Sequence, residues 1–232
     1  MTLKTQLMVA LDVPELELAL GLVDQLGDQV SWYKVGKQLF THYGPNVLQE
    51  LKARGRKVFL DMKFHDIPNT VGQAIRSAAL IGADIINVHA SGGPAMLAAA
   101  AEAGRETGKT VIAVTVLTSM DASQLQAIGI QASPAEQVLR LARLAREAGL
   151  PGVVCSALEL PMLRKEFGAE FLTLVPGIRP AGAAAGDQKR IMTPAQAAAA
   201  GASYIIVGRP ILAAPEPATA ARAVLAELVN GN

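Results

Sequence analysis

The sequence predicts an α/β fold, a (β/α)8 TIM barrel formed by a single domain over residues 1–232. Three observations support this prediction. Short apolar runs rich in Val and Ile alternate with longer helical patterns, the runs look apolar on both faces, and no change of composition marks a linker. Strands that are apolar on both faces are typical of a parallel sheet covered by helices. Single barrels of this class commonly have about 250 residues.

The apolar runs follow one another at about the spacing of one strand–helix unit. They are Leu7–Leu11, Val30–Val35, Lys57–Asp61, Asp84–His89, Thr110–Leu117, Gly152–Cys155, Phe171–Val175 and Tyr204–Val207. An open, doubly wound sheet is the alternative. Nucleotide-binding sheets of that kind carry a Gly-x-Gly-x-x-Gly turn or a Gly-x-x-x-x-Gly-Lys-[Ser/Thr] loop. The sequence contains neither motif at the required place, so the closed barrel is favoured.

Capping patterns indicate where several helices begin and end. Ser133-Pro134-Ala135-Glu136 is a capping box with Pro at the first helical position, and Thr193-Pro194-Ala195-Gln196 repeats this opening. Thr70-Val71-Gly72-Gln73 is a weaker example and predicts a helix that begins after Thr70. Gly149 and Gly201 are expected at the carboxyl ends of helices.

The composition favours a globular protein with a large core. Apolar residues make up 51% of the chain, charged residues 18%, and the formal net charge is +1. No basic run indicates nucleic-acid or membrane-surface binding. No apolar run approaches the ~20 residues that cross a membrane, and no signal peptide is visible. We therefore expect a cytoplasmic protein, in which the single cysteine, Cys155, is a buried core residue.

Polar side chains recur where the predicted strands end. The residues at these positions are Asp12, Lys34, Asp61, Lys63, Asp66, Thr118, Arg179 and Arg209, which follows Gly208. In a barrel the carboxyl ends of the strands converge on one mouth, where active sites lie. Because side chains alternate between the two faces of a strand, Asp61 and Lys63 should point the same way. Such charges are costly to bury unless they are paired or functional, so this mouth is the candidate active site.

The last two strand ends indicate a phosphate site. Gly177 and Gly208 allow close approach of the backbone, and Arg179 and Arg209 supply donors suited to phosphate oxygens. Barrels often bind phosphate with the loops after strands seven and eight. The small residues of segment 181–189 predict a lid that closes over substrate, with an ordinary surface loop as the alternative.

Metal binding has little support in the sequence. His42, His65 and His89 lack ligand spacing such as His-x-x-x-His, and we expect structural roles for the last two. An Asp-rich mouth could hold magnesium, but Lys34 and Lys63 already compensate the nearby aspartates.

The segment Asp61-Met62-Lys63-Phe64-His65-Asp66-Ile67-Pro68-Asn69-Thr70 is a specific signature, and other motifs accompany it in order. They are Val9-Ala10-Leu11-Asp12, Lys34-Val35-Gly36, Asn87-Val88-His89-Ala90-Ser91-Gly92-Gly93, Val114-Thr115-Val116-Leu117-Thr118-Ser119-Met120, Pro176-Gly177-Ile178-Arg179-Pro180, Gly186-Asp187-Gln188 and Val207-Gly208-Arg209-Pro210. With these motifs the chain closely resembles the bacterial type of orotidine 5′-monophosphate decarboxylase over nearly its whole length. The resemblance implies conversion of orotidine 5′-monophosphate to UMP and CO2 in pyrimidine biosynthesis, through a carbanion at C6.

The resemblance also implies a catalytic role for four residues. Lys34, Asp61 and Lys63 match the family's charged network, and Lys63 matches the proton donor. Asp66 matches the residue that reaches into the neighbouring subunit's site, so a homodimer is expected. No metal and no organic cofactor are expected, and the partner molecule is a small nucleotide substrate.

A further set of residues is implied to bind the substrate. The set comprises Asp12, Lys34, Asp61, Thr70, Thr118, Arg179, Gln188, Gly208 and Arg209. Within it, Asp12 and Lys34 match contacts to the ribose, and Thr118 matches a contact to the pyrimidine. Gln188 and Arg209 match contacts to the phosphate.

Three other functions remain as alternatives. Related barrels with the same Asp-x-Lys-x-x-Asp signature act on sugar phosphates with magnesium, but they carry a metal-binding acid where Lys34 stands here. A Schiff-base aldolase would need a lysine of depressed pKa, which the neighbouring aspartates oppose. A non-catalytic phosphate-binding barrel would not need the lysine–aspartate network at all.

Overall fold

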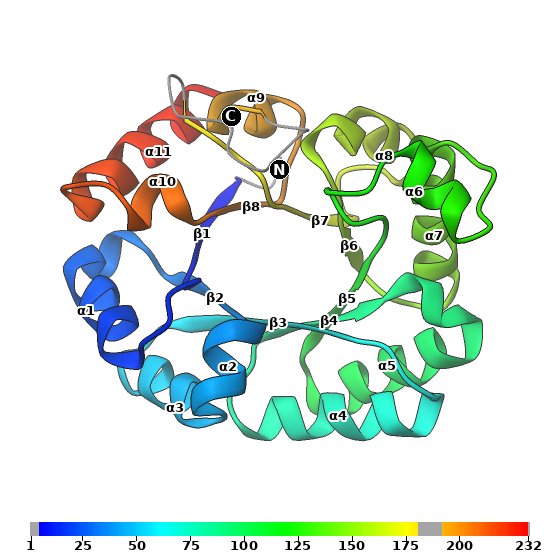
Figure 1. Ribbon diagram of the computed structural model, residues 1–232, viewed down its shortest axis with the longest axis horizontal. Coiled ribbons are helices and arrows are strands. Elements are labelled where there is room, and N and C mark those ends of the chain that lie inside the picture. Colours follow the sequence, from blue (N-terminus) through cyan, green and yellow to red (C-terminus); the bar gives the residue numbers. More distant parts are fainter. Residues whose placement is uncertain (1–4, 181–191, 232) are drawn as a thin grey trace.

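The computed structural model describes residues 5–180 and 192–231. Its strands form a closed, fully parallel barrel in which each strand pairs with the next and β8 pairs with β1 (Figure 1). The strands are β1 (Gln6–Ala10), β2 (Trp32–Gly36), β3 (Lys57–Phe64), β4 (Ile85–His89), β5 (Thr110–Val114), β6 (Gly152–Val154), β7 (Leu172–Val175) and β8 (Tyr204–Val207). The predicted TIM-barrel fold is therefore confirmed.

Helices form a layer around the barrel and cover the outer face of the strands (Figure 1). They are α1 (Leu16–Leu26), α2 (Lys37–Tyr43), α3 (Asn46–Ala53), α4 (Pro68–Leu80), α5 (Gly93–Thr107), α6 (Ala122–Ala127), α7 (Pro134–Glu147), α8 (Leu160–Phe167), α9 (Pro194–Ala199), α10 (Arg209–Leu212) and α11 (Pro217–Gly231). No described helix is long and apolar enough to cross a membrane.

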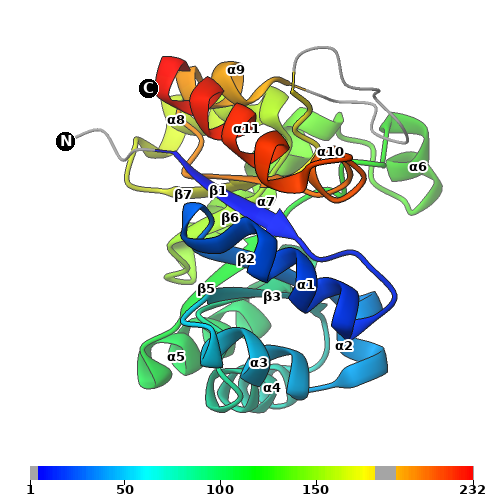
Figure 2. The same cartoon turned by 90° about the vertical axis from the view of Figure 1, so that its left-hand side faces the viewer.

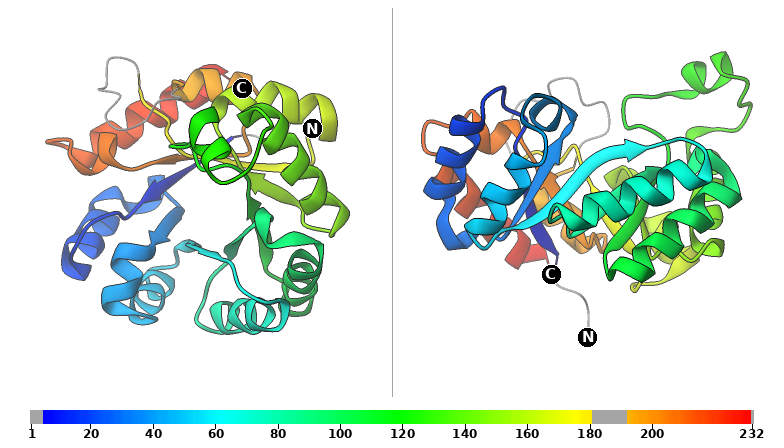
Figure 3. Two further views of the ribbon diagram at one scale, coloured as in Figure 1. Left: turned by 45° about the vertical axis from the view of Figure 1, so that its right-hand side comes forward. Right: turned by 90° about the horizontal axis from the view of Figure 1, so that it is seen from below.

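The strands point toward one end of the barrel, and short helices gather there. In Figure 2 the arrow of β1 points toward the end where α2 and α6 lie. The green segment around α6 rises above the same end in the right-hand view of Figure 3. This end is the mouth at which the carboxyl ends of the strands converge.

Two apolar clusters hold the fold together. The larger cluster lies between the strands and the surrounding helices and includes residues such as Tyr33, Val35 and Leu60. The smaller cluster consists of Met8, Ala10, Trp32, Phe59, Ile85, Ile112, Leu174 and Ile206. It draws its members from alternate positions of the strands, as side chains that fill a barrel interior do. This apolar plug leaves polar side chains to the mouth above it.

The predicted helix signals are mostly confirmed. Ser133 and Thr193 each form a reciprocal capping box at the start of α7 and α9. Gly149 and Gly201 follow helices with φ of 88° and 85°, values that favour glycine. The weaker prediction at Thr70 was wrong, because α4 begins at Pro68 and Thr70 lies in its first turn. Proline at the first helical position provided the actual start signal.

Candidate active site

A cavity of about 410 Å³ opens at the barrel mouth. Most of the residues predicted for the site line it: Asp12, Lys34, Asp61, Lys63, Thr118, Arg179, Gly208 and Arg209. The cavity lies above the apolar plug, since Ala10, Phe59 and Ile206 also line it. Its volume is within the range of small-molecule sites, which is ~300–1,000 Å³.

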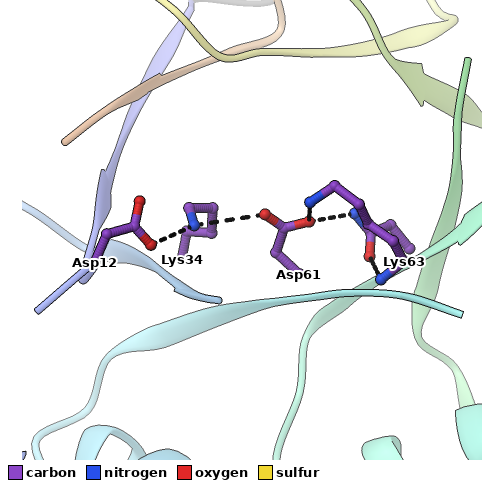
Figure 4. A network of polar contacts seen from close by, with 5 residues as sticks. Asp12, Lys34, Asp61 and Lys63 are labelled. Carbon is purple, nitrogen blue, oxygen red and sulfur yellow. Dashed lines mark hydrogen bonds and ion pairs between the residues drawn. The ribbon is translucent and has the colours of Figure 1, made fainter. Parts of the chain in front are cut away.

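Four charged side chains form a row across this cavity (Figure 4). Lys34 Nζ lies 2.8 Å from Asp12 Oδ1 and 3.5 Å from Asp61 Oδ2. Lys63 Nζ donates to Asp61 Oδ1 at 2.5 Å. Positive and negative groups alternate along the row, so each charge is paired with one of opposite sign. Such pairing allows Lys34 to be buried, with only 8% of its surface exposed.

The position of each side chain follows from its strand. Asp12, Lys34 and Asp61 each stand two residues beyond a member of the apolar plug, namely Ala10, Trp32 and Phe59. Because strand side chains alternate, residues two apart share a face, so these three point into the barrel. The three polar groups therefore lie as a layer directly above the plug.

Lys63 reaches this layer differently from the way strand alternation predicts. The pairing of β3 with β4 loses register between Leu60 and Phe64, which face Ile86 and Val88. Lys63 has φ of 55° and is the only non-glycine residue with positive φ in the described part of the chain. Regular alternation is therefore the wrong reason for the proximity of Asp61 and Lys63. A bulge that inserts extra residues into β3 brings the two side chains together.

Asn87 on β4 completes this arrangement, although the sequence did not predict a role for its side chain. Its side chain is fully buried. Its Oδ1 accepts a hydrogen bond of 2.7 Å from the backbone N–H of Lys63, and its Nδ2 donates one of 2.7 Å to Asp61 Oδ1. A signal was present, because Asn87 stands two residues beyond the plug residue Ile85, as the charged residues do on their own strands.

Asp61 is held in its ionised form. Burial alone would raise the pKa of its carboxyl group. The ammonium groups of Lys34 and Lys63, together with hydrogen bonds from Lys63 and Asn87, outweigh burial and lower this pKa below its ordinary value. Asp61 is thus a fixed negative charge at neutral pH.

The predicted phosphate-binding groups line the cavity from the ends of β7 and β8. Arg179 is 7% exposed, and its Nη1 donates to the backbone oxygen of Ile178 at 2.9 Å. Gly177 has φ of 79°, and Gly208 immediately precedes Arg209 at the start of α10. These backbone and guanidinium groups bring hydrogen-bond donors to one end of the site. The predicted lid, segment 181–189, and Gln188 within it lie outside the described residues.

Two predicted site residues do not line the cavity of their own chain. Asp66 is exposed in the loop between β3 and α4, where its Oδ1 accepts a hydrogen bond of 2.6 Å from the N–H of Ile67. Thr70 is exposed in the first turn of α4. Both belong to a surface beside the mouth, which also includes Ile67, 66% exposed.

Histidines and cysteine take other positions around the mouth. The rings of His65 and His89 lie 5.5 Å apart, and burial lowers the pKa of His89 to about 4, with smaller electrostatic contributions from the neighbouring His65 and Lys63. His89 is therefore neutral at physiological pH. Cys155 is buried, as predicted, and borders the cavity. Among the described residues, no group of His, Cys, Asp or Glu is arranged as a metal site.

The chain is similar to known proteins over nearly its whole length. Residues 5–224 match the model of the orotidine 5′-phosphate decarboxylase / HUMPS family. The chain is 51% identical to an orotidine 5′-phosphate decarboxylase of Nitrosococcus oceani, over 98% of this chain and 99% of the relative. It is 55% identical to one of Halorhodospira halophila, over 96% and 95% of the two chains. A crystal structure of the Lactobacillus acidophilus enzyme superposes with a TM-score of 0.86 at 37% identity, covering 97% of this chain and 99% of that one.

Proposed function

The chain belongs to the orotidine 5′-phosphate decarboxylase / HUMPS family, and from this premise we propose that it is a carboxy-lyase that converts orotidine 5′-monophosphate to UMP and CO2. The observation that carries the proposal is the row Asp12–Lys34–Asp61–Lys63 at the mouth of the barrel. A purely binding site would not require two lysines and an ionised aspartate in contact. The reaction places the protein in pyrimidine biosynthesis.

Lys63 is the proposed proton donor. Loss of CO2 from C6 leaves a carbanion that the pyrimidine ring cannot readily delocalise. The electrostatic attraction between this carbanion and an ammonium group about 4 Å away is worth about 4 kcal/mol at an effective dielectric constant of 20. If this attraction develops only in the transition state, it accelerates the reaction by roughly three orders of magnitude. Proton transfer from Lys63 Nζ to C6 then completes UMP.

Asp61 serves two purposes in this mechanism. Its ionised carboxylate accepts a hydrogen bond from Lys63 Nζ, which holds that ammonium group in place beside the reacting carbon. The same negative charge would lie beside the carboxylate of the substrate. Repulsion between the two carboxylates raises the free energy of the bound substrate and is relieved when CO2 departs.

The other predicted site residues bind the nucleotide. Asp12 and Lys34 contact the ribose, and Thr118 contacts the pyrimidine. Arg179, Gln188, Gly208 and Arg209 form the phosphate end, where guanidinium groups match phosphate oxygens. Binding energy from the phosphate, far from C6, closes segment 181–189 over the substrate as a lid and excludes water from the row.

The enzyme acts as a homodimer in which Asp66 completes the partner's site. The exposure of Asp66, Ile67 and Thr70 beside the mouth, rather than inside it, supports this proposal. Asp66→Asn and Lys63→Ala should each be inactive alone. After the two variants are mixed under conditions that exchange subunits, activity should return to about a quarter of the wild-type value, since half of the dimers are hybrids with one intact site. No recovery despite proven exchange would contradict the shared site.

The proposed reaction can be tested directly with purified protein. The absorbance of orotidine 5′-monophosphate should fall on addition of the enzyme, at a rate unaffected by a chelator. Activity that a chelator abolishes would instead favour a magnesium-dependent enzyme. No turnover of this substrate would overturn the proposal.

A further inference from the structure

A polar side chain that none of the functional assignments uses lies in contact with both members of the catalytic pair. On β4, Ile86 pairs with Leu60 and Val88 pairs with Phe64. Between these two pairs, β4 contributes one residue, Asn87, whereas β3 contributes three. Residues 61–63 of β3 therefore stand opposite Asn87 alone. The bulge and the asparagine occupy the same level of the barrel.

The amide of Asn87 joins the two partners in a single orientation. The backbone N–H of Lys63 can only donate, and the ionised carboxylate of Asp61 can only accept. Asn87 meets the first with its oxygen and the second with its nitrogen, both at 2.7 Å. A side chain with only acceptors, or only donors, could not bridge these groups. Asparagine is also the shortest side chain that carries both kinds of group on one rigid plane.

The bridge acts on the least favourable backbone conformation in the site. Lys63 has φ of 55°, a region that side chains other than glycine seldom adopt. Such a conformation persists only when its surroundings hold it. The side chain of Lys63 starts from this backbone, so a change there would move Nζ away from Asp61 Oδ1 and from the reacting carbon.

We propose that Asn87 is a positioning residue, whose amide holds the bulged backbone of Lys63 and the carboxylate of Asp61 in catalytic register. This inference rests on the proposed decarboxylase function. It predicts that loss of the bridge lowers kcat much more than it changes KM, because the ribose and phosphate contacts come from other strands. A misplacement of about 1 Å can reduce a rate about a hundredfold, which is the size of effect expected for Asn87→Ala.

The variant Asn87→Asp should keep the hydrogen bond from the Lys63 N–H and lose the hydrogen bond to Asp61. The new carboxylate still accepts from the Lys63 N–H but meets Asp61 with an acceptor where a donor stood. Two carboxylates in contact retain a proton to higher pH than one does. The charged or titratable groups around the pair are Lys34, Lys63 and, farther off, Asp12, His65 and His89. The acid limb of the kcat–pH profile should therefore move to higher pH, which a merely structural loss would not cause.

Thr115→Val is a matched control for lost burial and hydrogen bonding. Thr115 is 5% exposed and is not among the residues that line the cavity, and its hydroxyl donates to the backbone oxygen of Val154 at 3.0 Å. This variant should lose stability but keep kcat within about threefold of wild type, with an unchanged pH profile. If Asn87→Ala does not fold, the similarly sized Asn87→Asp decides the question.

A readout independent of turnover separates this inference from the proposed function. Hydrogen exchange followed by NMR should show the Lys63 amide proton protected in the wild type and in Asn87→Asp, and exposed to exchange in Asn87→Ala. A wild type inactive on orotidine 5′-monophosphate would refute the function but leave this pattern intact. Equal protection in Asn87→Ala and wild type, or a kcat within threefold of Thr115→Val, would overturn the role of Asn87.

Discussion

Gly36 offers a specific way to disturb the charged row without altering any charge. A Cβ atom at this position would lie 2.9 Å from Lys34 Nζ and 3.1 Å from Asp12 Oδ1. The backbone of Gly36 has φ of −95° and ψ of 179°, which alanine adopts without strain. The methyl group of Gly36→Ala would therefore act through contact alone, and the flexible end of Lys34 would give way.

The magnitude follows from the interaction that the methyl group displaces. A hydrogen bond to a charged group contributes about 1.5–3 kcal/mol. The Asp12 side chain is 53% exposed, so water replaces part of the lost contact, and the lower value applies. A loss of about 1.5 kcal/mol in transition-state binding reduces kcat/KM about tenfold. Because only a side-chain terminus moves, Tm should change by less than about 4 °C.

Steady-state kinetics and thermal unfolding of the same preparation would test this reasoning. Gly21→Ala is the matched control, because Gly21 lies inside α1 with nothing within 4 Å of the added methyl group. It should keep wild-type kcat/KM and gain slight helix stability. A Gly36→Ala variant with kcat/KM equal to that of Gly21→Ala would refute the proposed importance of the Lys34–Asp12 contact.

Two further predictions concern the phosphate end and the pH dependence of stability. Arg209→Ala should lower kcat as well as raise KM, because phosphate binding drives closure of the site; a steady-state effect restricted to KM would count against this coupling. Burial lowers the pKa of His89 from 6.5 to about 4, so the folded state favours the neutral ring. The free energy of unfolding should therefore keep its full value above pH 6.5 and decrease as the pH falls toward 4. The contribution of His89 to this decrease is about 3 kcal/mol at most. Chemical unfolding of wild type and His89→Gln across this range should show a shallower decline in the variant, and parallel curves would exclude His89 as the cause.

The barrel could be predicted from the sequence because its strands are apolar on both faces. A strand buried on both faces has a continuous run of Val and Ile, which can be recognised in the sequence without knowledge of distant contacts. Ile85–Val88 is such a run, interrupted only by Asn87. Strand limits were less predictable. The run Thr110–Leu117 is strand only to Val114, whereas β3 extends beyond Asp61 to Phe64. The ends of a strand depend on its pairing with the neighbouring strand, and this pairing cannot be read from the sequence of one segment.

The composition of the site could be predicted further than its geometry. Asp12, Lys34 and Asp61 follow from position alone, since each stands two residues beyond an inward-facing apolar side chain. The bulge at Lys63 could not be predicted in this way, because it depends on how β3 and β4 align. Contacts across a subunit boundary, proposed for Asp66, involve a second chain and leave no periodic pattern in the first.

The central claim, that Lys63 stabilises and protonates the carbanion, is tested most directly by the turnover of Lys63→Ala. Lys52→Ala is the control, because Lys52 Nζ also pairs with an aspartate at 2.8 Å, Asp84 at the opposite end of β4. With both variants folded by circular dichroism, Lys52→Ala should retain wild-type kcat. Lys63→Ala should lose at least about three orders of magnitude, the full electrostatic contribution of the ammonium group. Retention of more than about a tenth of wild-type activity, a loss below ~1.4 kcal/mol, would contradict the role of Lys63 as the acid.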